Sequence, residues 1–361
     1  MTSRKQTRTV DVGSVPVGGG APVSVQSMCN VDPHDAEALC SQIDRCAALG
    51  CDIMRLTVPD PAAAETFRVV RRRSPLPLVA DIHFDYRLAL AAIDAGADAL
   101  RLNPGNIGGR EHVQAVVRAA KAARVPIRIG VNFGSLEKDL DAEVRAGKLP
   151  VPEVLCRSAL RHLKLLEDER FFSAVISAKA SNVADTLAVY RLLSERTDCP
   201  LHMGVTEAGT FLPGTVRNSV ALGILLSEGI GDTIRVSLTA EPEKEVRVGT
   251  EILRALNLRA PGPSITSCPT CGRTRVNLFK VAAEVENALE ALARERGPHA
   301  KPLPHVAVMG CAVNGPGEAK NAEIALCGGK DEFLLYVRGR PVGKVSEQNA
   351  VEEVMKYVVS L

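Results

Sequence analysis

The sequence lacks tryptophan, is poor in aromatic residues and has almost no excess of charge of either sign. Of its 361 residues only 3% are aromatic, and 44 lysines and arginines nearly balance 42 aspartates and glutamates, so the formal net charge is +2. Proteins that bind nucleic acid usually combine a basic surface with stacking aromatic side chains. We therefore expect neither a nucleic-acid-binding protein nor one that binds an anionic membrane surface, and any role of positive charge must be local.

Several familiar signals are also missing. The apolar runs are too short to cross a bilayer, and residues 1–12 are polar and basic, unlike a secretory signal peptide. The GxGxxG, GxxxxGK[ST] and HExxH motifs do not occur, so electrons for any redox reaction would have to come from another protein. Ten cysteines without an export signal predict a cytoplasmic protein whose thiols are free or bind metal.

One structural unit recurs between Ala21 and Leu258: a short β-rich run that ends in polar residues, then a break, then an alanine- and leucine-rich helical stretch. Eight such runs occupy residues 22–28, 52–58, 78–84, 99–103, 126–132, 174–182, 201–207 and 232–238. Eight units in about 250 residues predict a (β/α)8 TIM-like barrel, and the absence of a long central crossover disfavours a doubly wound sheet.

A stretch rich in proline and glycine, Arg259–Ser264, follows the last unit and predicts a linker. We therefore expect a barrel domain over residues 1–260 and a smaller α/β domain over residues 261–361. In the second domain the patterns predict a helix near residues 276–294, strands near 305–309 and 333–337, and a closing helix from Ser346.

Polar side chains gather near the carboxyl ends of the predicted strands. Side chains two residues apart point the same way along a strand, and the active sites of such barrels lie at these ends. The pairs that share a direction are Arg55 with Thr57, Asp81 with His83, Arg101 with Asn103, Arg128 with Asn132, Lys179 with Ser181, and Arg235 with Ser237. Five cations at equivalent positions predict a site for a ligand with more than one phosphoryl group. Alternatively, some of them form ion pairs with Asp81 or Glu207 and close the barrel mouth.

The cysteines of the second domain form a separate pattern. Cys268 and Cys271 are spaced so that both sulfurs can bind one metal ion or cluster, and Cys311 lies in a turn-rich segment with Glu318 seven residues later. This spacing fits a zinc ribbon, a redox pair or an iron-sulfur site. A zinc site with Cys327 as the fourth thiolate is therefore an open alternative.

The chain resembles a known family, the bacterial 4-hydroxy-3-methylbut-2-enyl diphosphate synthases. These are iron-sulfur enzymes of the non-mevalonate isoprenoid pathway. The resemblance rests on both cysteine segments and on motifs that run nearly from end to end of the chain. These motifs are PVSVQSM (22–28), DIHF (81–84), LRLNPGN (100–106), IRIGVN (127–132), AKASN (178–182), GVTEAG (204–209) and DTIRVS (232–237).

The resemblance implies a [4Fe-4S] cluster on Cys268, Cys271 and Cys311, with Glu318 as a fourth, exchangeable ligand, in a domain like those of sulfite and nitrite reductases. It implies reductive ring opening and dehydration of 2-C-methyl-D-erythritol 2,4-cyclodiphosphate, with electrons from flavodoxin or ferredoxin. Glu207 is then the best candidate proton donor. The diphosphate contacts that carry over are Arg55, Arg101, Arg128, Asn132, Lys179, Arg235 and Ser237, with Asp81, His83 and Thr206 nearby.

Two rival functions remain at this stage: a non-redox lyase or transferase on the same barrel with a structural zinc, and a zinc-ribbon nucleic-acid binder. The path of the chain also predicts its assembly. Leu258 should lie at the end of the barrel opposite the site, so a short linker would barely bring the second domain over its own barrel. We therefore expect a homodimer in which each cluster domain completes the active site of the partner.

Overall fold

The computed structural model describes residues 3–260, 262–296, 301–313, 317 and 319–361. Two compact units make up the chain: a barrel unit, Met1–Arg259, and a C-terminal unit, Ala260–Leu361. Each has its own hydrophobic core. Within the described residues, no helix is both long and apolar enough to cross a membrane.

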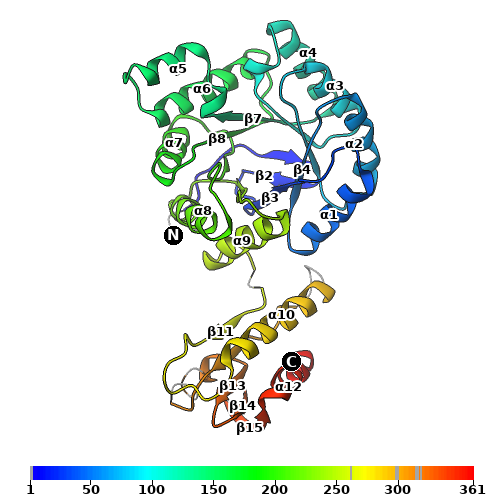
Figure 1. Ribbon diagram of the computed structural model, residues 1–361. Coiled ribbons are helices and arrows are strands. Elements are labelled where there is room, and N and C mark those ends of the chain that lie inside the picture. The colour runs from blue at the N-terminus through cyan, green and yellow to red at the C-terminus, as the bar shows by residue number, and fades with distance from the viewer. Residues whose placement is uncertain (1–2, 261, 297–300, 314–316, 318) are drawn as a thin grey trace. The chain divides into compact units, whose positions relative to one another are not determined.

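Parallel strands form the wall of the barrel unit (Figure 1). They are β3 (Ser24–Met28), β4 (Ile53–Thr57), β5 (Leu78–Asp81), β6 (Ala99–Leu102), β7 (Ile127–Asn132), β8 (Ala174–Lys179), β9 (His202–Met203) and β10 (Thr233–Ile234). Their order is β8-β7-β6-β5-β4-β3-β10-β9, and a parallel bridge between Ile176 and Leu201 joins the two outer strands and closes the ring. Each strand falls in one of the eight predicted runs, so the (β/α)8 barrel is confirmed.

Helices surround the strands (Figure 1). They are α1 (Ala36–Ala48), α2 (Pro61–Arg73), α3 (Tyr86–Asp94), α4 (Arg110–Ala123), α5 (Lys138–Arg145), α6 (Val151–Asp168), α7 (Val183–Arg196), α8 (Phe211–Ser227) and α9 (Pro242–Ala255), with short 3-10 turns η1 (Pro104–Asn106) and η2 (Phe133–Ser135). Asp35, Asp60 and Asn182 cap helices by accepting a backbone N–H in the first turn. The apolar strand residues that alternate with the polar ones, such as Leu100 and Ile127, are fully buried in the main core.

An N-terminal hairpin, which the sequence analysis did not predict, packs against the barrel. Its antiparallel strands are β1 (Val10–Val12) and β2 (Val15–Val17). Their valines form a small core with strand residues including Ile53, the first residue of β4, and Ala99, the first residue of β6. The hairpin therefore lies at the amino ends of the strands, opposite the end where a barrel active site is expected.

The C-terminal unit is built on a five-stranded sheet. The strands are β11 (Ile265–Ser267), β12 (Val306–Met309), β13 (Ile324–Gly328), β14 (Glu332–Val337) and β15 (Arg340–Ser346), in that order, with β11, β12 and β13 parallel and the rest antiparallel. Helices α10 (Leu278–Arg296) and α12 (Ala350–Ser360) pack on this sheet, with the short turns η3 (Ala319–Asn321) and η4 (Glu347–Asn349) beside them. The expected helix start at Ser346 is wrong, because Ser346 ends β15 and α12 begins at Ala350.

Candidate active site

A pocket of about 760 Å³ opens at the carboxyl ends of the barrel strands. Its wall includes residues that follow or end β5, β6, β7, β8 and β9, so five strands contribute to one cavity. Six of the predicted site residues line it: His83, Arg101, Asn132, Lys179, Thr206 and Glu207. The fold therefore brings together side chains that are more than one hundred residues apart in the sequence.

Beside this pocket, Asp81 acts as the shared counter-ion of two arginines. Arg101 Nη1 lies 3.1 Å from Asp81 Oδ1, and Arg55 Nε lies 3.7 Å from Asp81 Oδ2. Burial raises the pKa of Asp81, but Arg55 and Arg101 outweigh that effect and the net shift is downward. The expected ion pairing with Asp81 is thus present, and the carboxylate remains charged.

The other predicted cations are only partly compensated. Arg235 Nη2 lies 3.5 Å from Glu245 Oε2, whereas Arg128 Nη2 donates to a neutral acceptor, Gln26 Oε1, at 3.1 Å. Burial, followed by the neighbouring cations, lowers the pKa of Lys179 well below its usual value. Burial and the neighbouring cations also lower the pKa of Arg128 well below its usual value.

The cluster as a whole therefore has surplus positive charge. Five basic side chains, Arg55, Arg101, Arg128, Lys179 and Arg235, share two carboxylate partners among the described residues: Asp81 pairs with Arg55 and Arg101, and Glu245 pairs with Arg235. Burial lowers the pKa of Arg55 to about 10, despite the opposing effect of Asp81. An anion bound here would relieve the mutual repulsion of these groups, which is the condition for strong binding of a phosphoryl ligand.

Local backbone geometry shapes the pocket next to Glu207. Glu207 is exposed on the pocket wall and has a left-handed backbone conformation with φ of 52°, which few non-glycine residues adopt. At Gly204, an added Cβ would lie 2.2 Å from the Arg235 carbonyl oxygen and 3.1 Å from Lys179 Nζ. Only glycine leaves room there for the lysine.

The structure separates Ser237 from the residues of the pocket wall. Ser237 is half-buried, and its carbonyl oxygen accepts a hydrogen bond from Asn218 Nδ2 at 3.4 Å. Arg55, Asp81 and Arg128 are buried, and Arg235 is half-buried like the wall residue Arg101. Ser237 therefore has the least structural support among the predicted substrate contacts.

Sequence reasoning missed four residues beside this cluster: Gln26, Met28, His202 and Glu245. Gln26 and Met28 are two residues apart on β3 and so share a face, and Met28 Sδ accepts a bond from Arg55 Nη2 at 2.8 Å. His202, Gly204 and Thr206 are spaced two residues apart, so the three positions face the same side of the strand. This spacing could have been recognised in the sequence. Glu245 had no such signal, because it lies on α9 and reaches the strands only through folding, where it accepts from Ser27 Oγ at 2.8 Å.

The predicted cluster ligands are in the C-terminal unit. Cys268 directly follows β11 and Cys311 follows β12, and these strands are parallel neighbours, so both cysteines lie at the same edge of the sheet. Cys268 and Cys311 are half-buried, Cys271 is exposed, and none of the ten cysteines, all of which lie among the described residues, forms a disulfide. Gly310 N–H donates to Cys268 Sγ at 3.3 Å.

The donor set fits a metal cluster chemically, although the side chains are not gathered around one point. Among the residues that the structure describes, no three His, Cys, Asp or Glu side chains form a group that could hold a metal ion, and Glu318 lies outside those residues. Cys327, the fourth thiolate of the zinc alternative, is buried in an apolar cluster with Ala307 and Ala325. Cys268 packs against the same cluster, so burial alone does not distinguish the set of Cys268, Cys271 and Cys311 from one that includes Cys327.

Comparisons with known proteins cover nearly the whole chain. The family model of the GcpE TIM-barrel domain matches residues 7–250, and that of the GcpE protein C-terminal domain matches residues 264–360. The 4-hydroxy-3-methylbut-2-en-1-yl diphosphate synthase (flavodoxin) of Lawsonia intracellularis is 51% identical over 363 residues, covering 99% of this chain and 98% of the relative. The enzyme of the same name from Geobacter sulfurreducens is 53% identical over 355 residues, covering 98% of each chain.

A solved structure shares the fold at low identity. N-acetylneuraminic acid (sialic acid) synthetase from Leptospira borgpetersenii in complex with citrate superposes with a TM-score of 0.51. Its sequence is 12% identical, and the match covers 81% of this chain and 99% of that one. Likeness at this level of identity concerns the fold alone.

Proposed function

Because this chain belongs to the GcpE family of 4-hydroxy-3-methylbut-2-en-1-yl diphosphate synthases, we propose that it reductively opens and dehydrates 2-C-methyl-D-erythritol 2,4-cyclodiphosphate. The product is 4-hydroxy-3-methylbut-2-enyl diphosphate, and the reaction consumes two electrons. The structural observation that supports this function is the surplus of buried positive charge beside a pocket of about 760 Å³. A cyclic diphosphate has the charge to neutralise that surplus.

The barrel residues bind and orient this substrate. Arg101, Asn132 and Lys179 line the pocket and would contact the diphosphate, with His83 and Thr206 at its edge. Arg55, Arg128, Arg235 and Asp81 supply charge and rigidity, and Ser237 remains a predicted contact. Arginines anchored on strands hold phosphoryl groups with little loss of side-chain entropy.

Glu207 would donate the proton that leaves with the departing oxygen as water. It is exposed on the pocket wall, directly after Thr206, whose N–H bonds the carbonyl of Ala180 across the strand ends. This backbone bond fixes the segment in which the carboxyl group lies. A carboxyl group at the pocket wall can reach a substrate held by Lys179 and Arg101.

The C-terminal unit would hold a [4Fe-4S] cluster on Cys268, Cys271 and Cys311, with Glu318 as fourth ligand. The bound cluster supplies electrons and a Lewis-acidic iron. Curated relatives carry flavodoxin in their names, which supports flavodoxin as the electron donor of this chain, with ferredoxin as the alternative. Ten cysteines that form no disulfide within the described residues suit a reducing compartment, and a cytoplasmic location remains our prediction.

The active site is proposed to be shared between the two chains of a homodimer. Arg259, the last residue of the barrel unit, bonds Asp52 at 2.6 Å, and Asp52 immediately precedes β4 at the end of the barrel opposite the pocket. The steps from Arg259 to Ile265 span at most about 22 Å. Helix α9 alone covers about 21 Å of barrel depth, so the linker would have to be almost fully extended to bring a chain's own cluster to its own pocket. The cluster of a second chain can reach the pocket without this constraint.

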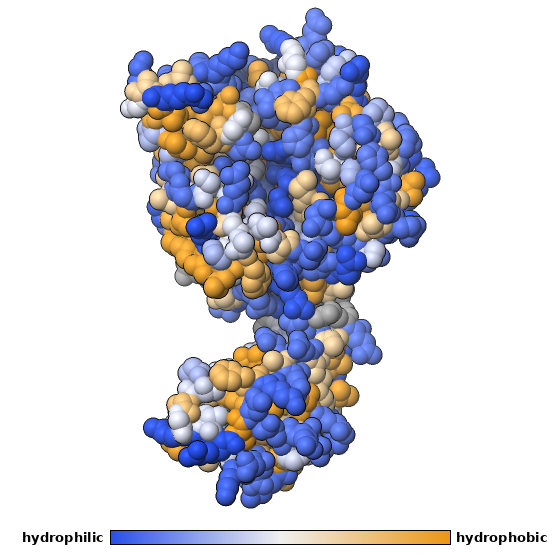
Figure 2. Space-filling model, in the orientation of Figure 1, coloured by the Kyte–Doolittle hydropathy of each residue, from blue (hydrophilic) through white to orange (hydrophobic). Residues whose placement is uncertain are grey.

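An apolar stripe on α8 supports association of two barrels. Leu212, Val216, Val220 and Ile224 recur every four residues and are 37% to 70% exposed, so they occupy one face of the helix. Figure 2 shows apolar side chains gathered on the barrel surface near the position that Figure 1 gives α8. Such a stripe of exposed apolar side chains is typical of an interface.

Anaerobic absorption and EPR spectra of the purified protein, with and without the cyclodiphosphate, test the function. An iron-sulfur spectrum that changes on addition of substrate, with turnover on reduced flavodoxin, is the expected result. Zinc in place of iron would favour the lyase or transferase alternative. Mixing inactive Glu207→Gln and Cys311→Ser proteins under subunit exchange should restore part of the activity, whereas proven exchange without recovery would exclude a shared site.

A further inference from the structure

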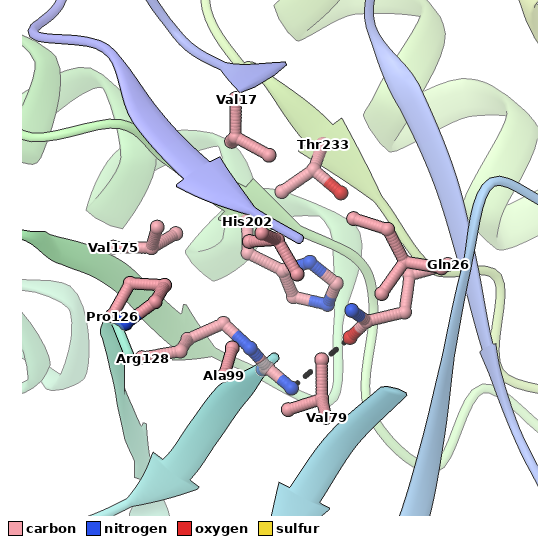
Figure 3. A pocket seen from close by; sticks show the side chains of 11 residues that line it. Val17, Gln26, Val79, Ala99, Pro126, Arg128, Val175, His202 and Thr233 are labelled. Atoms are coloured by element: carbon pink, nitrogen blue, oxygen red, sulfur yellow. Dashed lines mark hydrogen bonds between the residues drawn. The ribbon is translucent and has the colours of Figure 1, made fainter. Parts of the chain in front are cut away.

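A small cavity lies inside the barrel, between the N-terminal hairpin and the cation cluster. Its volume is about 20 Å³, and its wall combines valine side chains, including Val17 and Val79, with four polar groups. The polar groups are Gln26, Arg128, His202 and Thr233. In Figure 3 the His202 ring lies between Thr233 and the hydrogen-bonded pair of Gln26 and Arg128.

His202 is fully buried, yet among the described residues neither ring nitrogen has a hydrogen-bond partner. Thr233 Oγ1 is likewise buried and unpartnered within the described chain. The backbone of His202 is held firmly, because its carbonyl oxygen accepts a bond of 2.7 Å from the hydroxyl of Tyr190. Buried polar groups normally have partners, so these groups point to a ligand in the cavity.

The imidazole of His202 is neutral. Burial lowers its pKa well below the usual value, and Arg128, Lys179, Arg55 and Arg235 lower it further. A neutral ring can both accept and donate one hydrogen bond without adding to the surplus of positive charge. The neutral ring can therefore lie beside the cation cluster, whereas a protonated ring would be repelled by the cluster.

The size of the cavity matches one water molecule. A water needs about 10–15 Å³ of this kind of volume and two to four polar partners. The cavity exceeds that volume, and the four polar side chains supply the partners. Larger ligands are excluded by the valine walls and by the hairpin that covers the amino ends of the strands.

We propose that one buried water occupies this cavity and that His202, through this water, positions Gln26 and the Arg128 guanidinium for binding of the substrate diphosphate. His202 is a positioning residue: it lines this small cavity together with Arg128 and is not among the residues that line the larger pocket. Gln26 Oε1 already holds Arg128 Nη2 at 3.1 Å, so a bond that orients the Gln26 amide also orients the guanidinium. The inference rests on the proposed function, because it assigns Arg128 to the diphosphate.

Binding of inorganic pyrophosphate to the full-length protein, measured by calorimetry, provides the test. His202→Leu should weaken binding at least about tenfold, because it leaves the network without its buried partner. His202→Gln should restore much of this loss, since its amide can bond the water. The control is Val79→Ala, which alters the same cavity wall without removing a polar group and should bind pyrophosphate normally even if its melting temperature falls.

If His202→Leu binds pyrophosphate as tightly as the unaltered protein, this inference is overturned and the proposed function is not affected. An equal loss in Val79→Ala would also overturn it, since the effect would then be one of packing. If His202→Leu fails to fold, Thr233→Val and a crystal structure that resolves ordered water decide the matter: weaker binding and density between His202 and Gln26 support the proposal, and an empty cavity overturns it. Failure of the unaltered protein to bind either pyrophosphate or the cyclodiphosphate would overturn the proposed function as well.

Discussion

Asp81 and Arg101 face each other on neighbouring strands: they are register partners of β5 and β6, and Arg101 Nη1 lies 3.1 Å from Asp81 Oδ1. The same carboxylate faces Arg55 at 3.7 Å. Asp81 therefore reduces the repulsion between the buried Arg55 and the half-buried Arg101. The two arginines share this carboxylate as their counter-ion.

Replacing Asp81 by Asn should lower the free energy of unfolding by about 3–5 kcal/mol, since the buried Arg55 and the half-buried Arg101 lose their counter-ion. Because the pKa of Asp81 is lowered in the folded state, its contribution is present above pH of about 4 and is lost as pH falls through the folded-state value. Urea unfolding at several pH values measures this. Pyrophosphate should stabilise the variant more than the unaltered protein; equal stability of both proteins at neutral pH would contradict the shared counter-ion.

The Glu207→Gln variant should bind the cyclodiphosphate normally but turn over at least about a hundredfold more slowly, because an amide of similar shape cannot donate the proton. Binding is measured by calorimetry, and turnover with reduced flavodoxin. The pocket mutation Asn132→Ala is the comparison and should act mainly through KM. A normal kcat in Glu207→Gln would remove Glu207 from the proton transfer.

Binding of pyrophosphate should be accompanied by proton uptake at Lys179. The pKa of Lys179 is lowered in the free protein by burial and by neighbouring cations, and a bound anion favours its charged form. Calorimetry in buffers of different ionisation enthalpy measures the protons exchanged. Lys179→Met should show less uptake than the unaltered protein, and an unchanged value would mean that Lys179 is already fully charged in the free protein.

Val216→Glu should prevent dimerisation, because it introduces a charge in the middle of the apolar stripe on α8. Sedimentation of this variant should give a monomer that retains its cluster but has little activity. Val69→Glu, at a similarly exposed valine of α2, is the matched control and should remain dimeric. A dimeric Val216→Glu protein would place the interface elsewhere.

Serine in place of Cys268, Cys271 or Cys311 should abolish iron binding while the barrel unit, which has its own core, remains folded. Cys327→Ser should keep its iron, because the proposed ligand set does not include Cys327. Glu318→Ala should keep a cluster that is sensitive to oxygen and supports little turnover. Iron analysis and circular dichroism distinguish these cases, and loss of metal in Cys327→Ser would favour the zinc alternative.

Sequence patterns that depend only on nearby residues predicted much of the structure of this protein. The eight β-rich runs, the alternation that separates Arg101 from Leu100 and Leu102, and the burial of Cys40 and Cys46 were all readable, because strand and helix periodicities depend on nearby residues. The valine alternation around Gly13 was readable too but was missed, because the hairpin is short and follows a basic segment.

Only the tertiary structure decided which polar groups meet. Glu245 on α9 reaches Arg235, Asp52 bonds Arg259, which is 207 residues away in the sequence, and the His202 ring has no hydrogen-bond partner among the described residues. The periodicity of the sequence does not predict such contacts. They depend on how the barrel closes and on which charged groups are buried away from water. The sequence by itself determined the barrel and its cations, whereas burial in the closed barrel decided their pairing, their pKa values and the neutral histidine among them.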